Sequence, residues 1–350
     1  MDFGIGVTSG VAAWRVVQRA EALGFTHAWF VDTQLLCADP FASMAVAAVH
    51  TSRIRLGTAV LVPSNRIAPV TANGLATVNR LAPGRIDFGV GTGFTARNTM
   101  GLPPMRLADL REHVRVVRGL LAGETVECAL EGQRRAIRFL NPEAGLIEIG
   151  HPIPLHLSAF GPRARALTAE IADGWMHFVG RLTAGLRAMR EMVEACRAAG
   201  RDPASLYTTA FAMGCVLAEG EAHDGPRARA QAGPFALTFY HSIMDGSLPL
   251  RVPSALAPAV AEYRALYETY QPAHARYLQL HRGHFMFPRP DEERFLTADL
   301  LRDMTFTARS EELRDRIRAL RDAGHDQFAV FLAPGHEDAL EDWARLVEAV

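Results

Sequence analysis

Short apolar runs recur along the chain, and most are followed by a segment with apolar residues at helical spacing. Continuous apolar runs of this kind are typical of strands buried on both faces, whereas apolar residues three and four positions apart indicate amphipathic helices. The predicted strands cover residues 3–7, 27–32, 54–61, 86–91, 154–158, 174–179, 207–217 and 326–332. The predicted helices cover residues 13–23, 40–49, 70–81, 106–121, 163–172, 183–199, 311–323 and 338–350, with Asp39 and Ser310 as caps.

Eight strands that alternate with eight helices predict a (β/α)₈ TIM barrel. A doubly wound sheet is the alternative, but at this length it usually splits off a second domain, and the sequence has no linker. We therefore expect one domain over residues 1–350. Two segments break the alternation: 126–148, a polar hairpin insertion after strand four, and 220–302, an insertion or lid after strand seven.

The net charge, the cysteines and the apolar runs indicate which partners and which cell compartment to expect. The net charge of −1 over 350 residues argues against a nucleic-acid or membrane surface, so we expect a small-molecule substrate. The four cysteines have neither metal-binding nor disulfide spacing, which is typical of a reducing cytoplasm. The sequence also has no secretory signal and no apolar run long enough to cross a bilayer, so we expect a cytoplasmic protein.

The chain contains no lysine, because all 37 of its strongly basic residues are arginine. Schiff-base chemistry on lysine and a P-loop lysine are thereby excluded, and with them a barrel aldolase. Any bound phosphate must be held by arginine, by hydroxyl groups or by backbone N–H groups.

Candidate chemistry lies just after the predicted strands, because the active sites of such barrels form at the carboxyl ends of the strands. Asp32 and His177 are the catalytic candidates, each with a structural role as the alternative. A glycine-rich loop with Thr92, Gly93 and Arg97 follows strand four, and a tight turn is its alternative. After strand five, the helix start with Ser158, Gly161 and Arg163 is suited to a phosphate.

The long insertion carries His281 and His284, three residues apart. With no third ligand in view, we expect no metal site there. Together with Tyr240, His241 and Phe285, these residues more plausibly line or cover a pocket; a solvated surface segment is the alternative.

Four segments resemble the bacterial-luciferase-like superfamily of flavin- and deazaflavin-dependent oxidoreductases. They read AEALGFTHAWFVD at 20–32, RIRLGTAVLVPSNRIAPV at 53–70, LAPGRIDFGVGTG at 81–93 and SAFGPRARALTAEIADGW at 158–175. The resemblance implies a (β/α)₈ barrel with insertions, usually as a homodimer.

The resemblance also implies where a flavin would bind. It implies a non-proline cis peptide bond at Ala59–Val60, behind the middle ring of the flavin. It assigns the cofactor tail to the loop at 91–97 and to a second loop, and it adds Asp32 to the cofactor-binding residues. The second loop comprises Ser158, Ala159, Phe160, Gly161, Pro162 and Arg163.

Two positions depart from the family's deazaflavin-dependent sugar dehydrogenases, which have a histidine after the aspartate of strand two and a glutamate after the GTG sequence. Thr33 and Phe94 stand there in this chain. Dehydrogenation of a sugar by that pair is therefore not expected, and Phe94 suits an apolar substrate.

Three functions follow from the resemblance. The first is a monooxygenase that uses reduced FMN and O₂ on a small, largely apolar substrate, with a separate flavin reductase as a possible partner. The second is a reductase or dehydrogenase that transfers hydride with coenzyme F420. The third, from another class, is a non-catalytic flavin-binding protein. Turnover of the reduced cofactor with any acceptor separates the third from the other two.

Overall fold

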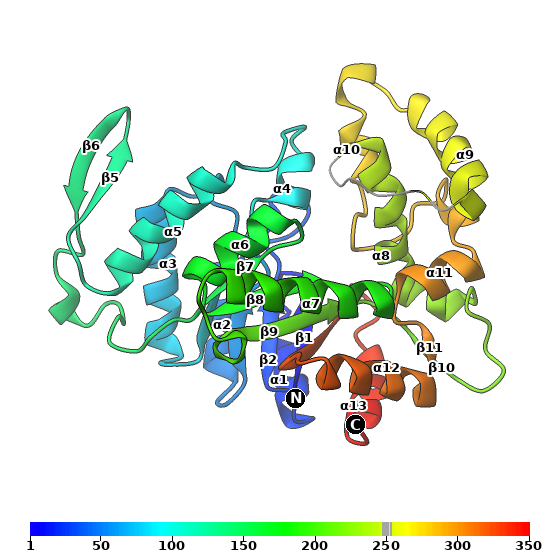
Figure 1. Ribbon diagram of the computed structural model, residues 1–350, viewed down its shortest axis with the longest axis horizontal. Coiled ribbons are helices and arrows are strands. Elements are labelled where there is room, and N and C mark those ends of the chain that lie inside the picture. The colour runs from blue at the N-terminus through cyan, green and yellow to red at the C-terminus, as the bar shows by residue number, and fades with distance from the viewer. Residues whose placement is uncertain (247–251, 253) are drawn as a thin grey trace.

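The computed structural model describes residues 1–246, 252 and 254–350. Eight parallel strands close into a barrel in the order β1-β12-β9-β8-β7-β4-β3-β2, which confirms the predicted TIM barrel (Figure 1). The barrel strands are β1 (Asp2–Val7), β2 (His27–Phe30), β3 (Arg55–Thr58), β4 (Ile86–Val90), β7 (Leu155–Ser158), β8 (Gly174–Phe178), β9 (Tyr207–Ala212) and β12 (Gln327–Phe331).

Helices surround the barrel at the places that the apolar spacing predicts. They are α1 (Trp14–Ala22), α2 (Pro40–His50), α3 (Ala68–Leu81), α5 (Leu107–Leu121), α6 (Pro162–Ile171), α7 (Leu182–Ala198), α12 (Ser310–Asp322) and α13 (Ala339–Val347). Asp39 caps α2 by accepting a hydrogen bond from the Ala42 N–H at 3.1 Å, as predicted. The predicted cap at Ser310 is wrong: Ser310 is the first residue of α12, and Arg309 precedes it without a side-chain cap.

The predicted strand 207–217 is divided into two. After β9 the chain leaves the barrel, and β10 (Val216–Leu217) pairs instead with β11 (Ala308–Arg309). Gly214 lies at this crossing, where a Cβ atom would stand 2.0 Å from the backbone oxygen of Phe306. Only glycine allows two backbones to approach so closely, so the apolar run alone does not give the length of the strand.

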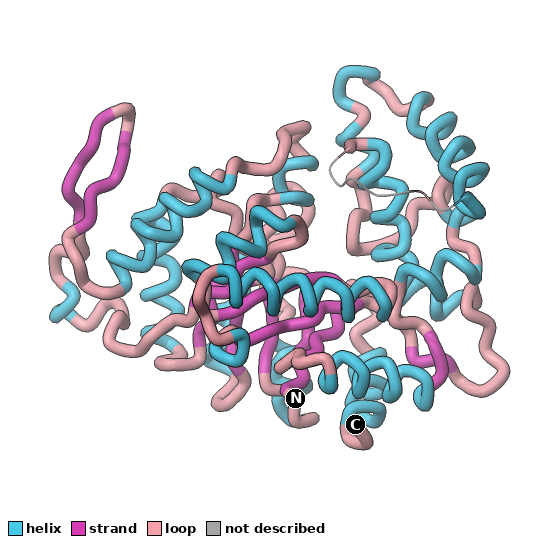
Figure 2. Tube along the Cα trace, viewed as in Figure 1, coloured by secondary structure: helices cyan, strands magenta, loops and turns pink. Residues whose placement is uncertain are grey.

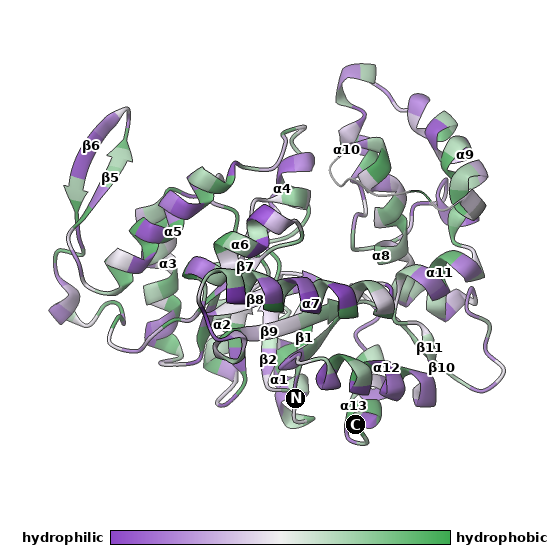
Figure 3. Cartoon of the chain, in the orientation of Figure 1, coloured by the Kyte–Doolittle hydropathy of each residue, from purple (hydrophilic) through white to green (hydrophobic). Residues whose placement is uncertain are grey.

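The polar segment 126–148 contains the predicted hairpin, β5 (Val126–Leu130) and β6 (Gln133–Ile137), paired antiparallel. It stands away from the barrel in Figure 2, and Figure 3 shows β6 as hydrophilic over most of its length. The hairpin follows α5 and precedes β7, so it lies on a helix-to-strand connection and not directly after β4.

The second insertion forms a group of helices beside the barrel (Figure 1). Its helices are α8 (Pro226–Met244), α9 (Ala257–Glu268), α10 (Tyr277–Leu280) and α11 (Ala298–Met304). They bury a small core of their own that includes Tyr240, Tyr263 and Leu296. A short helix after β4, α4 (Phe94–Asn98), lies across from them.

The amino-terminal end of the barrel is closed by polar groups. Asp87 on β4 is 2% exposed, and Arg55 on β3 binds it through two nitrogens at 2.9 and 2.8 Å. His156 Nε2 lies 3.4 Å from the same carboxylate. Above this layer, Trp29 donates a hydrogen bond to Gln327 Oε1 at 2.9 Å. These contacts stabilise the end of the barrel that lies opposite the expected active site.

Among the described residues, no helix combines the length and the apolar character that a bilayer crossing requires.

Candidate functional site

The carboxyl ends of β3, β4 and β7 converge on one small area. A Cβ atom added to Gly91 would lie 3.0 Å from Val60 Cγ2 and 3.3 Å from Ser158 Cβ, so the three residues are neighbours. The peptide bond Ala59–Val60 is cis, as the resemblance implied. The structure therefore brings together Ala59, Val60 and Ser158 beside Gly91, at the end of the barrel where function is expected.

Five phenylalanine side chains cover this area from the opposite side. The aromatic wall, as we call it, consists of Phe178, Phe211, Phe235, Phe285 and Phe331. Phe178 at the end of β8 lies 5.5 Å, between ring centroids, from both Phe235 of α8 and Phe285 of the insertion. Ala59 and Val60 pack against the same cluster. The cis peptide therefore packs beside an apolar cluster to which the second insertion contributes two rings.

Asp32 follows β2 as predicted, but its carboxylate is 4% exposed and is already paired. Arg66 Nη1 donates to Asp32 Oδ2 at 2.8 Å, and the Val62 N–H and Asn65 Nδ2 approach the same oxygen at 3.3 Å. A carboxylate held by three donors stabilises the loop that follows the cis peptide. This environment argues against a proton-accepting role for Asp32 and favours a positioning role.

The glycine-rich loop after β4 has a backbone conformation that favours glycine at Gly93. Gly93 has φ of 81°, and a Cβ atom there would stand 2.4 Å from Val62 Cγ1. The Thr92 carbonyl accepts a hydrogen bond from the Met105 N–H at 2.9 Å. Arg97 donates through Nε to the Pro103 carbonyl. Arg97 therefore secures its own loop with this nitrogen, while the loop backbone lies beside Val62.

The segment that joins β7 to α6 contains exposed residues as well as a buried residue held by a hydrogen bond. Phe160, Gly161, Pro162 and Arg163 are exposed, whereas Ala159 is buried and its carbonyl accepts from Trp175 Nε1 at 2.9 Å. No side chain caps α6, and a Cβ atom on Gly161 would meet nothing within 4 Å. The sequence analysis missed the nearby Arg165, which is 8% exposed, donates to the Phe160 carbonyl and pairs with Glu191 at 2.6 Å.

His177 does not lie where a catalytic residue is needed. It is 3% exposed and stacks on Trp175 with ring centroids 4.0 Å apart, and its Nε2 lies 2.9 Å from His325 Nε2. Trp175 packs in the cluster with Met189 of α7, between the barrel and its helices. Burial lowers the pKa of His177 well below its usual value. The prediction of a catalytic His177 is therefore wrong, because its side chain points out of the barrel.

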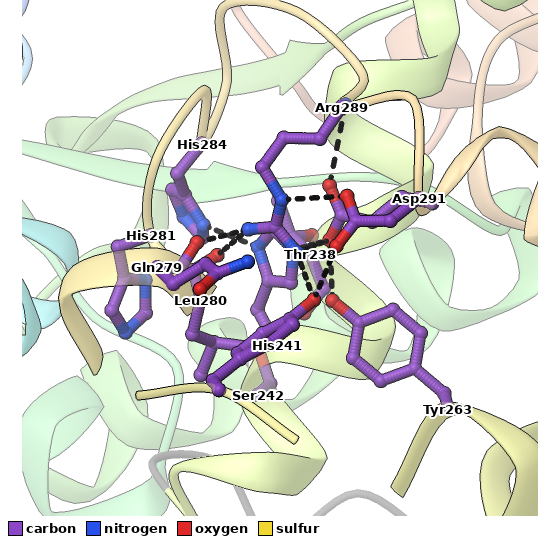
Figure 4. Close-up of polar contacts among 12 residues, drawn as sticks. Thr238, His241, Ser242, Tyr263, Gln279, Leu280, His281, His284, Arg289 and Asp291 are labelled. Atoms are coloured by element: carbon purple, nitrogen blue, oxygen red, sulfur yellow. Dashed lines mark hydrogen bonds and ion pairs between the residues drawn. The ribbon is translucent and has the colours of Figure 1, made fainter. Parts of the chain in front are cut away.

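The histidines of the second insertion form a buried cluster, which Figure 4 shows in close-up. His281 and His284 are joined by His241 of α8, 40 residues earlier in the chain; all three are 2% exposed or less. His284 Nε2 lies 3.3 Å from Thr95 Oγ1 on α4, so the cluster touches the loop at the barrel mouth. In the sequence no third ligand was in view beside His281 and His284, but chain folding brings His241 to them.

The observed strand ends fit a flat cofactor with a phosphorylated tail. Small residues and a cis peptide lie at the strand ends, and the aromatic wall packs against them. Beyond Ser158, the uncapped first turn of α6 offers N–H groups to an anion, and the exposed guanidinium of Arg163 lies on that turn.

Comparison with known proteins agrees with this geometry. A family model described as luciferase-like monooxygenase matches residues 8–327. A 5,10-methylenetetrahydromethanopterin reductase of Methanolobus tindarius is 30% identical over 217 residues, which are 61% of this chain and 64% of that one. An F420-dependent glucose-6-phosphate dehydrogenase of Beutenbergia cavernae is 36% identical over 141 residues, 38% of this chain and 40% of that one. The chain thus matches less than two thirds of the length of either relative.

A solved structure has the same fold. The coenzyme F420-dependent tetrahydromethanopterin reductase of Methanopyrus kandleri superposes with a TM-score of 0.71 at 20% identity, over 99% of this chain and 98% of that one. The family model covers 320 of the 350 residues, leaving out β1 and most of β12, and the named relatives are oxidoreductases. The chain therefore belongs to the luciferase-like monooxygenase family of oxidoreductases.

Proposed function

We propose that the protein is a coenzyme F420-dependent oxidoreductase that transfers hydride to or from an apolar substrate. The observation that carries this proposal is the 36% identity over 141 residues with a relative named as F420-dependent. It favours the F420-dependent enzyme, the second of the three functions that the sequence left open, over the FMN monooxygenase. The comparisons support the monooxygenase only at the level of the family.

The residues at the strand ends have distinct tasks in this proposal. Ala59 and Val60 would support the ring from one side, while Ser158 and the first turn of α6 would bind the tail, with Arg163 balancing its negative charge. The deazaflavin ring, when bound, supplies the hydride chemistry. Asp32 contributes indirectly, because its pairing with Arg66 holds the loop after the cis peptide in place.

The aromatic wall supports an apolar substrate. Phe178, Phe235 and Phe285 offer rings and no ionisable group to the space beside the cis peptide. Thr33 and Phe94 occupy the positions of the histidine and glutamate of the sugar dehydrogenases. We therefore expect enones, imines or apolar secondary alcohols as substrates, and no activity on sugar phosphates.

The aromatic wall also supports a second candidate, the monooxygenase with reduced FMN, O₂ and a separate flavin reductase, because such a reaction needs water to be excluded. A turnover assay separates the two candidates. Reduced F420 is mixed anaerobically with a panel of cyclic enones and imines, and its oxidation is followed by absorbance. The F420 proposal predicts oxidation that depends on both acceptor and enzyme. Acceptor turnover with reduced FMN and O₂ alone would contradict it.

A further inference from the structure

We propose that His241, His281 and His284 bind one divalent transition-metal ion, such as Zn²⁺, which fixes the second insertion against the mouth of the barrel. This site is separate from the proposed cofactor site, and its test does not depend on catalysis. The three rings come from three places in the insertion: α8, the end of α10 and the turn that follows it.

The first ground is proximity. One ring nitrogen of each histidine lies within 4.8 Å of those of the other two, and His241 Nδ1 lies 2.7 Å from His284 Nδ1. Zinc binds histidine nitrogens at about 2.0–2.1 Å, which places two ligands of a tetrahedral ion roughly 3.3 Å apart. Ring movements of about 0.6 Å for the His241–His284 pair and of about 1.5 Å or less for His281 therefore suffice.

The second ground is an unsatisfied ring. His281 is 2% exposed, yet among the described residues neither of its ring nitrogens has a hydrogen-bond partner. Its Nε2 stands 3.3 Å from Asp245 Oδ2. Buried polar atoms without a partner are uncommon in native proteins and call for an explanation, such as an ion. A metal bound by one nitrogen, with Asp245 beside the other, would satisfy the ring.

The third ground is the set of groups behind the histidines. His241 Nε2 lies 2.7 Å from Glu292 Oε1, and Glu292 is paired with Arg289 at 3.0 Å. The Glu292 carboxylate can only accept, so His241 donates through Nε2 and its Nδ1 keeps a lone pair directed at His284. A carboxylate behind a histidine is the arrangement that orients metal-binding imidazoles in proteins.

His284 can complete the site by a change of tautomer. Without a metal, His284 donates through Nδ1 to His241 and accepts the Thr95 hydroxyl at Nε2. With a metal at Nδ1, the proton moves to Nε2 and the Thr95 hydroxyl accepts it, because a hydroxyl group can do both.

The charge of the surrounding groups also suits a cation. Two carboxylates adjoin the cluster: Glu292 beside His241, and Asp245, whose Oδ2 lies 3.3 Å from His281 Nε2. Figure 4 shows Arg289 and Asp291 on one side of the histidines and Tyr263 near them.

The position of the histidine cluster indicates that the ion would have a structural role. His284 contacts α4 through Thr95, and the next residue, Phe285, packs against Phe178 and Phe235 of the aromatic wall. An ion on His284 would therefore fix both the turn and the ring that covers the cis peptide. The sequence analysis grouped His241 with His281 and His284 around a pocket but did not count it as a third metal ligand, because it lies 40 residues before His281.

The test uses the full chain without a histidine tag, stripped of metal with dipicolinate. It is titrated with Zn²⁺ and, separately, with Co²⁺, whose visible spectrum reports nitrogen ligands. The variants His281→Leu and His284→Leu remove one ligand each. His113→Leu is the matched control, because His113 is also buried with an unpartnered Nε2 but lies alone on α5.

We expect one Zn²⁺ per chain in the wild type and in His113→Leu, with a raised melting temperature. Binding should be weaker by more than about 100-fold in the two ligand variants, because even changes behind the ligands cost 10- to 100-fold. Circular dichroism shows whether the variants fold. Wild-type protein that binds neither ion, or folded variants that bind Zn²⁺ as the wild type does, would overturn the proposal. If a variant fails to fold, the visible spectrum of Co²⁺ added to the wild-type protein still tests whether nitrogen ligands bind the ion.

Discussion

The buried carboxylate of Asp87 makes a quantitative prediction about stability in acid. Burial alone would raise its pKa, but His156 and Arg55 outweigh this effect through hydrogen bonds and charge and lower the pKa to about 2. The ordinary value is 3.8, so the folded state favours the ionised form by roughly 2–3 kcal/mol.

The sign follows from the depressed pKa. This part of the stability is fully present above about pH 5 and is lost as the pH falls through 3.8 towards 2. Of these roughly 2–3 kcal/mol, about 1 kcal/mol is lost by pH 3. In the variant Asp87→Asn this dependence disappears. The variant is also less stable at pH 7 by roughly 3–5 kcal/mol, because Arg55 keeps its charge without its partner.

The assay is equilibrium urea unfolding of both proteins at pH 7 and in steps down to pH 3. The difference between their free energies of unfolding isolates Asp87 from the other carboxylates and should shrink by about 1 kcal/mol over this range. Asp109→Asn is the control, because Asp109 pairs with Arg106 on the surface, and this variant should unfold like the wild type. A difference between wild type and Asp87→Asn that is constant with pH would refute this reasoning.

Three further predictions concern the barrel mouth. Arg163→Ala should weaken F420 binding by about 10- to 100-fold in a fluorescence titration at an unchanged melting temperature, since Arg163 is exposed and its role is a charged hydrogen bond to the tail; unchanged affinity would remove it from the site. Phe285→Ala should raise KM for apolar acceptors by roughly 10-fold with a smaller change in kcat, because it removes a ring of the aromatic wall; equal KM values would exclude this role. Gly93→Ala should lower the free energy of unfolding by more than about 1 kcal/mol and weaken F420 binding, because φ is 81° and the new Cβ would stand 2.4 Å from Val62; a variant as stable as the wild type would contradict the close approach.

The fold could be predicted from the sequence because buried parallel strands leave continuous apolar runs separated by amphipathic helices. Because these runs are apolar throughout, they do not show which way a given side chain points. His177 lies in a strand that is apolar on both faces, so the pattern could not show that its ring faces the helices. The run 207–217 gave no sign of the crossing at Gly214, because that crossing depends on a backbone 92 residues away, at Phe306.

The candidate site could be predicted only in part, because some of its features are local in the sequence and others depend on contacts between distant segments. The turn at Gly93 and the open start of α6 could be found because each depends on neighbouring residues, whereas the cis bond at Ala59–Val60 was implied by the resemblance to the family. The aromatic wall and the histidine cluster depend on the long insertion, whose helix α8 has Pro234 in its interior and polar residues among its apolar ones. His241 meets His284 only through that folding.

The central claim is that the barrel mouth binds coenzyme F420, and the most direct test is a parallel anaerobic titration of the purified protein with F420 and FMN. Each cofactor is used oxidised and reduced, and binding is followed by fluorescence. We predict saturable one-to-one binding of F420 that is at least about 10-fold tighter than that of FMN and that Arg163→Ala weakens. Tight binding of reduced FMN together with no binding of F420 would contradict the account.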